Sequence, residues 1–121
     1  MHEVSLCEDL IEQLETLAVQ HGAVGVAAFE LEVGRLSGAE PDLLRLAFAV
    51  ASKGTVAESA ALTVQLVEPL IICHACEREA VTPPHRLGCP ACGSLDTRLV
   101  AGDALVLRRV ELITNGETGH V

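Results

Sequence analysis

Two stretches of the chain place apolar residues three or four positions apart, the spacing of one buried helix face. In the first stretch, residues 5–22, the apolar positions are Leu6, Leu10, Leu14, Leu17 and Ala18. Ser5 is a favoured N-cap, Glu8 completes a capping box with it, and Gly22 is a favoured C-terminal stop. The pattern therefore predicts an amphipathic helix that begins at Ser5 and ends near Gly22.

The second helical stretch covers residues 41–54. Pro41 suits the first turn of a helix, and Gly54 suits its end. The apolar side consists of Leu43, Leu44, Ala47, Phe48 and Ala51. We expect these five side chains to face the core.

Three other stretches alternate apolar and polar residues, the period of a strand with one wet face. They are residues 23–34, 61–68 and 103–113. Because two strands alone are marginal, we expect the third strand to join the first two in one sheet. The last residues, "TNGETGHV", read as a polar tail. The sequence thus predicts an α+β fold of two helices on a three-stranded sheet.

Composition limits the class of protein. The 121 residues carry a formal charge of −9, with 17 acidic and 8 basic side chains, a balance that repels phosphate backbones. No apolar run approaches the roughly 20 residues that span a bilayer, and the amino terminus lacks the basic-then-apolar order of a secretory signal. We therefore expect a cytoplasmic protein that binds neither nucleic acid nor membrane.

Between the second and third strands lies a cysteine module, "CHACEREAVTPPHRLGCPAC". Its four cysteines, in the order C-x2-C-x12-C-x2-C, supply the tetrahedral sulfur shell that Zn(II) prefers. The predicted ligands are Cys73, Cys76, Cys89 and Cys92. Four protein ligands close the shell, which favours a structural zinc. Replacement of a thiolate by His74 or His85, or a disulfide switch, remains an alternative.

The domains expected from this order are a discontinuous domain of residues 1–70 and 102–121 and an inserted zinc ribbon of residues 71–101. Cys7 stands apart from the module. In the first turn of a helix it is more typical of packing than of metal binding, although its closeness to His2 leaves a metal role open.

The amino terminus offers a second metal site. The α-amine of Met1, the deprotonated amide of His2 and the His2 imidazole can chelate one ion through a five-membered and a six-membered ring. Such nitrogen-rich coordination suits Ni(II) or Cu(II). Glu3 can add its amide or carboxylate. On chemistry alone, an exposed histidine without function is the commoner interpretation.

Three segments together carry a family resemblance. "MHEVSL", "CHAC…CPAC" and "LVLRRVEL" occur in this order, and over residues 1–113 the chain resembles the HypA/HybF family of nickel-incorporation metallochaperones. The resemblance implies a mixed α/β nickel-binding domain with an inserted zinc ribbon. It implies Ni(II) as cargo at Met1, His2 and Glu3, supplemented by Glu40, and Zn(II) at the four cysteines. Some relatives have a histidine beside the second cysteine pair, whereas Gly93 stands there in this chain.

The resemblance also implies partners. These are a GTP-hydrolysing nickel-maturation protein and the large-subunit precursor of nickel–iron hydrogenase, with urease served in some organisms; the chain itself is a monomer or a homodimer. The alternative is a zinc-ribbon module that binds nucleic acid or transcription proteins, but the basic stripe and stacking aromatics it needs are missing. An enzyme is disfavoured because the sequence shows no nucleophile–base pair, phosphate loop or open metal shell.

Overall fold

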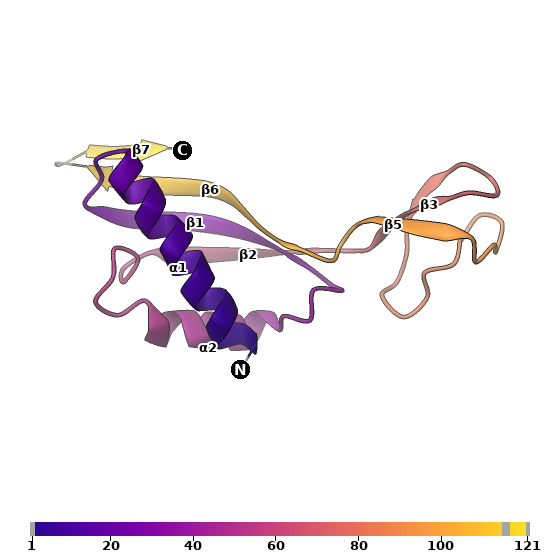
Figure 1. Ribbon diagram of the computed structural model, residues 1–121, viewed down its shortest axis with the longest axis horizontal. Coiled ribbons are helices and arrows are strands. Elements are labelled where there is room, and N and C mark those ends of the chain that lie inside the picture. The colour runs from indigo at the N-terminus through magenta and orange to yellow at the C-terminus, as the bar shows by residue number, and fades with distance from the viewer. Residues whose placement is uncertain (1, 115–116, 121) are drawn as a thin grey trace. The chain divides into compact units, whose positions relative to one another are not determined.

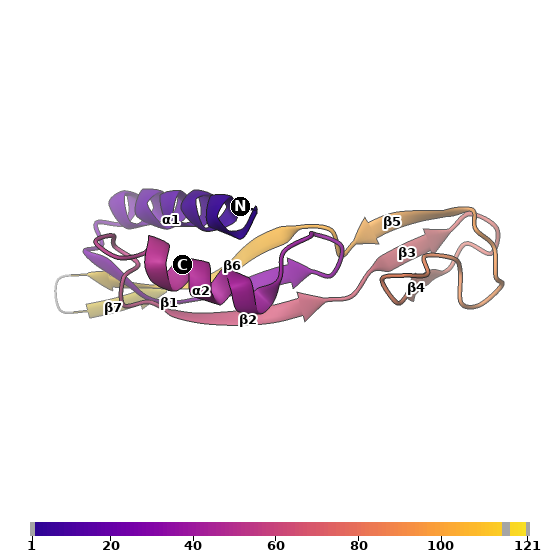
Figure 2. The ribbon, with the colours of Figure 1, turned by 90° about the horizontal axis from the view of Figure 1, so that it is seen from below.

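The computed structural model describes residues 2–114 and 117–120, with side chains over 3–114. Its elements, in chain order, are α1 His2–Gln20, β1 Gly25–Gly34, α2 Pro41–Ala51, β2 Ala61–Val67, β3 Leu70–Cys73, β4 Glu79–Val81, β5 Thr97–Ala101, β6 Leu105–Thr114 and β7 Glu117–His120 (Figures 1 and 2). They form two compact units. Unit 1 comprises Met1–Leu31, Ala39–Val64 and Leu107–Val121, and unit 2 comprises Glu32–Gly38 and Gln65–Val106.

The first helix differs from the prediction at its start. α1 already begins at His2, so the predicted cap at Ser5 is wrong, and Ser5 lies exposed within the helix. The end agrees with the prediction. Gly22 has a φ of 65°, its amide donates to the Val19 carbonyl, and the Ala23 amide donates to the Ala18 carbonyl. This pair of bonds is a Schellman motif, which needs a left-handed residue where glycine costs least.

A mixed sheet of order β2-β1-β6-β7 supports the two helices. The Val24 amide donates to the Ile113 carbonyl, and the Gly34 amide donates to the Ala104 carbonyl. The start of β1 therefore lies beside the end of β6 and its end beside the start of β6, so these two strands are antiparallel. β1 and β2 run in the same direction (Figure 2). The predicted three strands and the α+β class are confirmed. The predicted polar tail is wrong, because β7 pairs antiparallel with β6.

The core of unit 1 lies between the helices and one face of the sheet. The two phenylalanines of the chain meet there, with the rings of Phe29 and Phe48 5.1 Å apart in an edge-on arrangement. The buried apolar side chains around them are Cys7, Leu10, Ile11, Leu14, Ala18, Val26, Leu31, Leu44, Ala57, Val110 and Leu112. Not all predicted core residues are buried: Leu43 is 51% exposed, and four others are half-buried, namely Leu6, Leu17, Ala47 and Ala51.

Unit 2 contains a three-stranded antiparallel sheet of order β4-β3-β5. Its core is small and is made by Ile71, Cys73 and Cys89, with Ala80 and Leu99 packed against them. So little buried apolar area cannot by itself offset the entropy of ordering the chain. Much of the stability of this unit must therefore come from its cysteines.

Two glycines let the strands entering and leaving the cysteine module pass very close to one another. A Cβ on Gly102, which has a φ of 107°, would lie 2.7 Å from Pro69 Cα, and one on Gly34 would lie 2.4 Å from the Gly102 carbonyl. The turn after β1 also contacts Gly102, because the Leu36 amide donates to the Gly102 carbonyl. Only glycine fits at such a close approach.

None of the helices in the described part of the chain is long and apolar enough to cross a membrane.

Candidate metal centres

The four cysteines of the module converge on one point. Their sulfurs all lie within 4.8 Å of one another, with Cys73 and Cys92 3.6 Å apart and Cys76 and Cys89 3.7 Å apart. Four sulfurs at the usual Zn–S distance of about 2.3 Å from one tetrahedral centre are about 3.8 Å from each other. The donor set and its dimensions thus fit Zn(II), and the four predicted residues form a zinc-binding site.

Each cysteine pair is held by the same backbone hydrogen bonds. In the first pair, the Cys73 amide donates to the Arg78 carbonyl and the Glu77 amide to the Cys73 carbonyl; in the second, the Cys89 amide donates to Ser94 and the Gly93 amide to Cys89. Each cysteine pair and the turn that follows it form a knuckle, and both knuckles have a left-handed residue four positions after their first cysteine. Gly93 has a φ of 78° and Glu77 a φ of 62°.

The thiols do not share one ionisation state when no cation compensates them. The backbone amide of Cys92 is the main cause that lowers the pKa of Cys89, to about 6, and the Cys76 amide lowers the pKa of Cys73. The Ser94 amide lowers the pKa of Cys92. The hydrogen bond between the Cys92 and Cys73 thiols, together with desolvation, outweighs this effect and raises the pKa of Cys92 to about 11. A dication removes this conflict, because zinc binds thiolates and displaces their protons.

Neither nearby histidine belongs to the four-sulfur group that the described side chains form. His74 is bound elsewhere: its ring Nδ1 lies 3.1 Å from Asp96 Oδ1, and its amide donates to the Asp96 carbonyl. His85 is exposed. In the described arrangement, a zinc ion held at this site would therefore be coordinated by sulfur alone.

Of the predicted nickel ligands, His2 and Glu3 lie in the first turn of α1, and Glu40 lies directly before α2. Met1 lies outside the described residues, and so does the side chain of His2. Glu3 is described, and its Oε2 accepts a hydrogen bond of 3.3 Å from the amide of Glu40. The fold thus brings Glu3 next to Glu40, 37 positions away in the sequence.

Two helix N-termini meet at this contact. Glu40 is the N-cap of α2, but its own side chain makes no capping hydrogen bond, so the Glu3 carboxylate occupies that end of the helix. A helix N-terminus carries partial positive charge and leaves its first amides without intrahelical acceptors. A metal dication placed here requires negative donors. Carboxylates and a deprotonated amide are such donors.

Cys7 packs beneath this end of the two helices. It is fully buried, and its thiol donates to the Leu44 carbonyl of α2 at 3.5 Å. Burial, with the Glu3 carboxylate as a second cause, raises the pKa of the thiol. A buried, protonated thiol packs as a small apolar side chain and is a poor metal ligand.

Next to Glu3 a groove runs between α1 and α2, with a volume of about 690 Å³. It is lined by Glu3, Val4, Glu8, Leu43, Leu46, Ala47, Val50 and Ala51. Leu46 and Val50 are 66% and 70% exposed. This surface was not predicted from the sequence, although α2 is apolar on more than one side, which is unusual for a helix with only one buried face.

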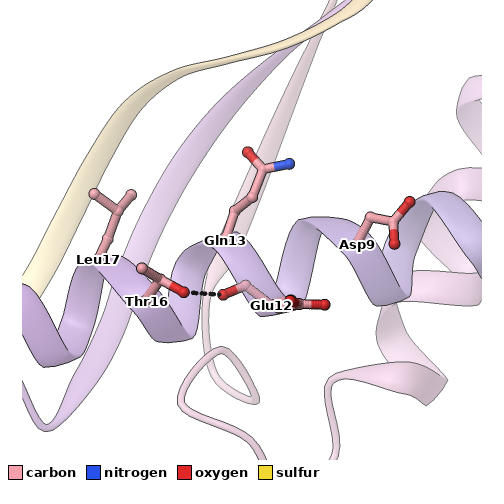
Figure 3. Close-up of a pocket in the computed structure, with 5 residues that line it drawn as sticks. All are labelled: Asp9, Glu12, Gln13, Thr16 and Leu17. Atoms are coloured by element: carbon pink, nitrogen blue, oxygen red, sulfur yellow. Dashed lines mark hydrogen bonds between the residues drawn. The ribbon is translucent and has the colours of Figure 1, made fainter.

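The solvent side of α1 beside this groove is acidic. Asp9, Glu12, Gln13, Thr16 and Leu17 line a shallow depression along it, in which the Thr16 hydroxyl donates to the Glu12 carbonyl (Figure 3). α1 carries Glu3, Glu8, Asp9, Glu12 and Glu15 and no lysine or arginine. The groove is therefore apolar at its base and negative at its α1 edge.

Comparison with known proteins gives a consistent result. Residues 1–112 match the family described as HypA, hydrogenase/urease nickel incorporation metallochaperone. Hydrogenase maturation factor HypA of Nitrosospira multiformis is 42% identical over 114 residues, covering 94% of this chain and 99% of that protein. That of Aquifex aeolicus is 37% identical over 112 residues, covering 93% and 97%.

Solved structures agree in fold. The solution structure of the Ni metallochaperone HypA from Helicobacter pylori superposes with a TM-score of 0.71 at 20% identity, covering 93% of this chain and 98% of that one. A second solution structure, of a HypA protein, gives 0.70 at 23% identity, covering 97% and 98%. The sequence matches span the cysteine module and the segments on both sides of it. A nucleic-acid-binding zinc ribbon would explain the module alone.

Proposed function

Because this chain belongs to the HypA family of nickel-incorporation metallochaperones, we propose that it takes Ni(II) at its amino terminus and delivers it to a nickel–iron hydrogenase precursor. The proposed ligands are Met1, His2 and Glu3, with Glu40 as a supplementary carboxylate. The observation that carries this site is the contact between Glu3 and Glu40 at the start of both helices.

The start of α1 suits chelation by backbone nitrogen. Since the helix begins at His2, the amides of His2 and Glu3 belong to the first turn, and neither must break an i to i−4 hydrogen bond to bind a metal. The Met1 amine, the His2 amide and the His2 ring would form a chelate of three nitrogens, to which Glu3 can add its amide or its carboxylate. The Glu3 and Glu40 carboxylates offset the positive ends of the helices.

Release of the ion follows from the same donors. A deprotonated amide and a neutral imidazole both compete with protons, so nickel affinity falls as the pH falls. A carrier also needs an affinity that its recipient can exceed. The zinc site, with four protein ligands, has a different role: it holds unit 2 together and does not exchange its ion during delivery.

The partners we propose are a GTP-hydrolysing nickel donor and the hydrogenase large-subunit precursor, both in the cytoplasm. We assign the groove between α1 and α2 to the precursor, because Glu3 lines it and a recipient has to reach the nickel ligands. The apolar base and acidic edge of the groove fit a segment of the precursor that carries apolar side chains beside lysine or arginine.

The test is calorimetric titration of Ni(II) into zinc-loaded protein with an authentic amino terminus. His2→Ala and a version extended before Met1 should each bind at least ~30-fold more weakly, about 2 kcal/mol. The matched control is His21→Ala, which removes an exposed histidine just past the other end of α1. Equal binding by all four proteins would refute the terminal site.

A further inference from the structure

The two helices of unit 1 are joined at their starts by two contacts with the same spacing. The Glu40 amide donates to Glu3 Oε2 at 3.3 Å, and the Cys7 thiol donates to the Leu44 carbonyl at 3.5 Å. Cys7 comes four residues after Glu3, and Leu44 comes four residues after Glu40, so each helix advances by about one turn between the contacts. From there the helices diverge (Figure 1). These two contacts therefore fix how the helix starts lie against each other.

The contact made by Cys7 is the more rigid of the two. Cys7 and Leu44 are 0% and 1% exposed, whereas the contact between Glu3 and Glu40 is open to solvent. A cysteine side chain has a single rotatable bond before its sulfur, and close packing holds that sulfur in place. Glu3 has a longer and more flexible side chain, so its carboxylate meets the Glu40 amide only when the helices lie at the right separation. The buried contact therefore determines whether the exposed one forms.

The thiol binds α2 without disturbing the helix. A backbone carbonyl has two lone pairs, so the Leu44 oxygen can accept from the thiol and from an amide of its own helix. A thiol is a weak donor, and its hydrogen bond contributes little to stability by itself. Its effect is geometric, because a larger side chain would force the helices apart and a smaller one would leave a void between them.

We propose that Cys7 is a positioning residue of the nickel site. Its buried thiol, bound to Leu44, sets the separation of the two helix starts at which the carboxylates of Glu3 and Glu40 serve one Ni(II) ion. Cys7 itself does not touch the ion. Removing a group that orients the ligands of a metal typically lowers the metal affinity by roughly 10–100-fold. The inference rests on the proposed function, because it needs Glu3 and Glu40 as nickel ligands.

The first test is the nickel affinity of the full-length, zinc-loaded protein. Cys7→Ala removes the donor and should weaken nickel binding at least ~10-fold. Cys7→Ser keeps a donor at this position and should recover most of the lost affinity. The matched control is Ile11→Val, which removes one buried methylene group from the next turn of α1 and should leave nickel affinity unchanged.

The second test needs no nickel and gives a readout that a general loss of core stability would not move. The NMR chemical shift of the Glu40 amide proton reports its hydrogen bond to the Glu3 carboxylate, and Glu3→Ala gives the shift of the same amide without that bond. In nickel-free Cys7→Ala the shift should move towards the Glu3→Ala value. In Ile11→Val it should keep its wild-type value. A native-like amide spectrum confirms that each variant is folded.

Wild-type nickel affinity in Cys7→Ala would overturn the proposal, and so would a Glu40 amide that keeps its wild-type shift in that variant. An Ile11→Val protein that loses as much nickel affinity as Cys7→Ala would also overturn it, since the effect would then follow core stability alone. So would a Cys7→Ser protein that binds nickel no better than Cys7→Ala. A wild-type protein that binds no nickel would instead refute the proposed function, and the Glu40 shift would still decide whether Cys7 holds the Glu3 contact.

Discussion

The carboxylate of Glu3 accepts a hydrogen bond from the amide of Glu40, so the first turn of α1 closes the open end of α2. One side chain therefore contributes both to the fold and to the proposed nickel site. Substitutions at this position can separate the two contributions, because glutamine keeps an acceptor oxygen but loses the charge.

Glu3→Gln should leave the free energy of unfolding nearly unchanged and weaken nickel binding. Glu3→Ala should weaken nickel binding and also cost about 1 kcal/mol of stability, the usual effect of losing a helix cap. Urea unfolding and nickel titration measure the two quantities. Glu12→Gln is the control for charge alone. A Glu3→Gln protein with wild-type nickel affinity would remove Glu3 from the ligand set.

Leu46→Glu tests the groove between α1 and α2. Leu46 is 66% exposed, so a charge there should change stability by less than about 0.5 kcal/mol. It should lower the rate of nickel transfer to the hydrogenase precursor while nickel affinity stays the same. Leu95→Glu, at an 87% exposed leucine of unit 2, is the matched control. Equal transfer rates for the two variants would show that the precursor docks elsewhere.

Substitutions at equivalent positions of the two cysteine knuckles should have opposite effects on the stability of zinc-loaded unit 2. Glu77 occupies the left-handed conformation in which Gly93 stands in the other knuckle. Glu77→Gly should stabilise zinc-loaded unit 2 by about 0.5–1 kcal/mol, and Gly93→Ala should destabilise it by a similar amount. The space at Gly93 is open, so its cost is conformational. Competition with a zinc chelator measures both effects as changes in zinc affinity. A lower zinc affinity in Glu77→Gly would show that the left-handed conformation of Glu77 is not strained.

Stability at alkaline pH should depend on Cys7. Burial and the Glu3 carboxylate raise the pKa of its thiol in the folded protein, so folding favours the protonated form. This contribution is complete below the pKa of the unfolded thiol, about 8.5, and is lost as the pH rises through the folded value. As the pH rises above the pKa of the unfolded thiol, wild type should therefore lose more stability than Cys7→Ala. Parallel pH profiles would exclude Cys7 as the cause.

Sequence patterns predicted those parts of the structure that depend on local chemistry. The alternation of apolar and polar residues over residues 23–34 predicted a strand with one wet face, and Phe29, Leu31 and Val33 on its other face are buried. The spacing of the four cysteines predicted their convergence, because two residues between thiols leave little freedom at each knuckle. Gly22 ends its helix by the conformation that its sequence position suggested.

Other features depend on contacts that the sequence does not display. α1 begins three residues before the Ser5 cap, at the end where Glu3 meets the start of α2. β7 has no strand pattern of its own and takes its form by pairing with β6. Leu43 follows the helical spacing of core residues, but the described side chains leave it 51% exposed. Distant pairing and missing partners of this kind are invisible to local periodicity.

The close approach of Gly102 to Pro69 affects the entropy of closing the loop between β2 and β6. Between β2 and β6 lie residues 68–104, and a long loop of this kind has to be closed for the two strands to join one sheet. While the cysteine module is folded, the close approach of Gly102 to Pro69 fastens the base of that loop and makes it effectively short. Loss of zinc would open the base to its full length, but closure entropy grows only with the logarithm of length, by roughly 2 kcal/mol for an eightfold increase. The helices and their sheet should therefore survive zinc removal, somewhat weakened, as a separately melting body.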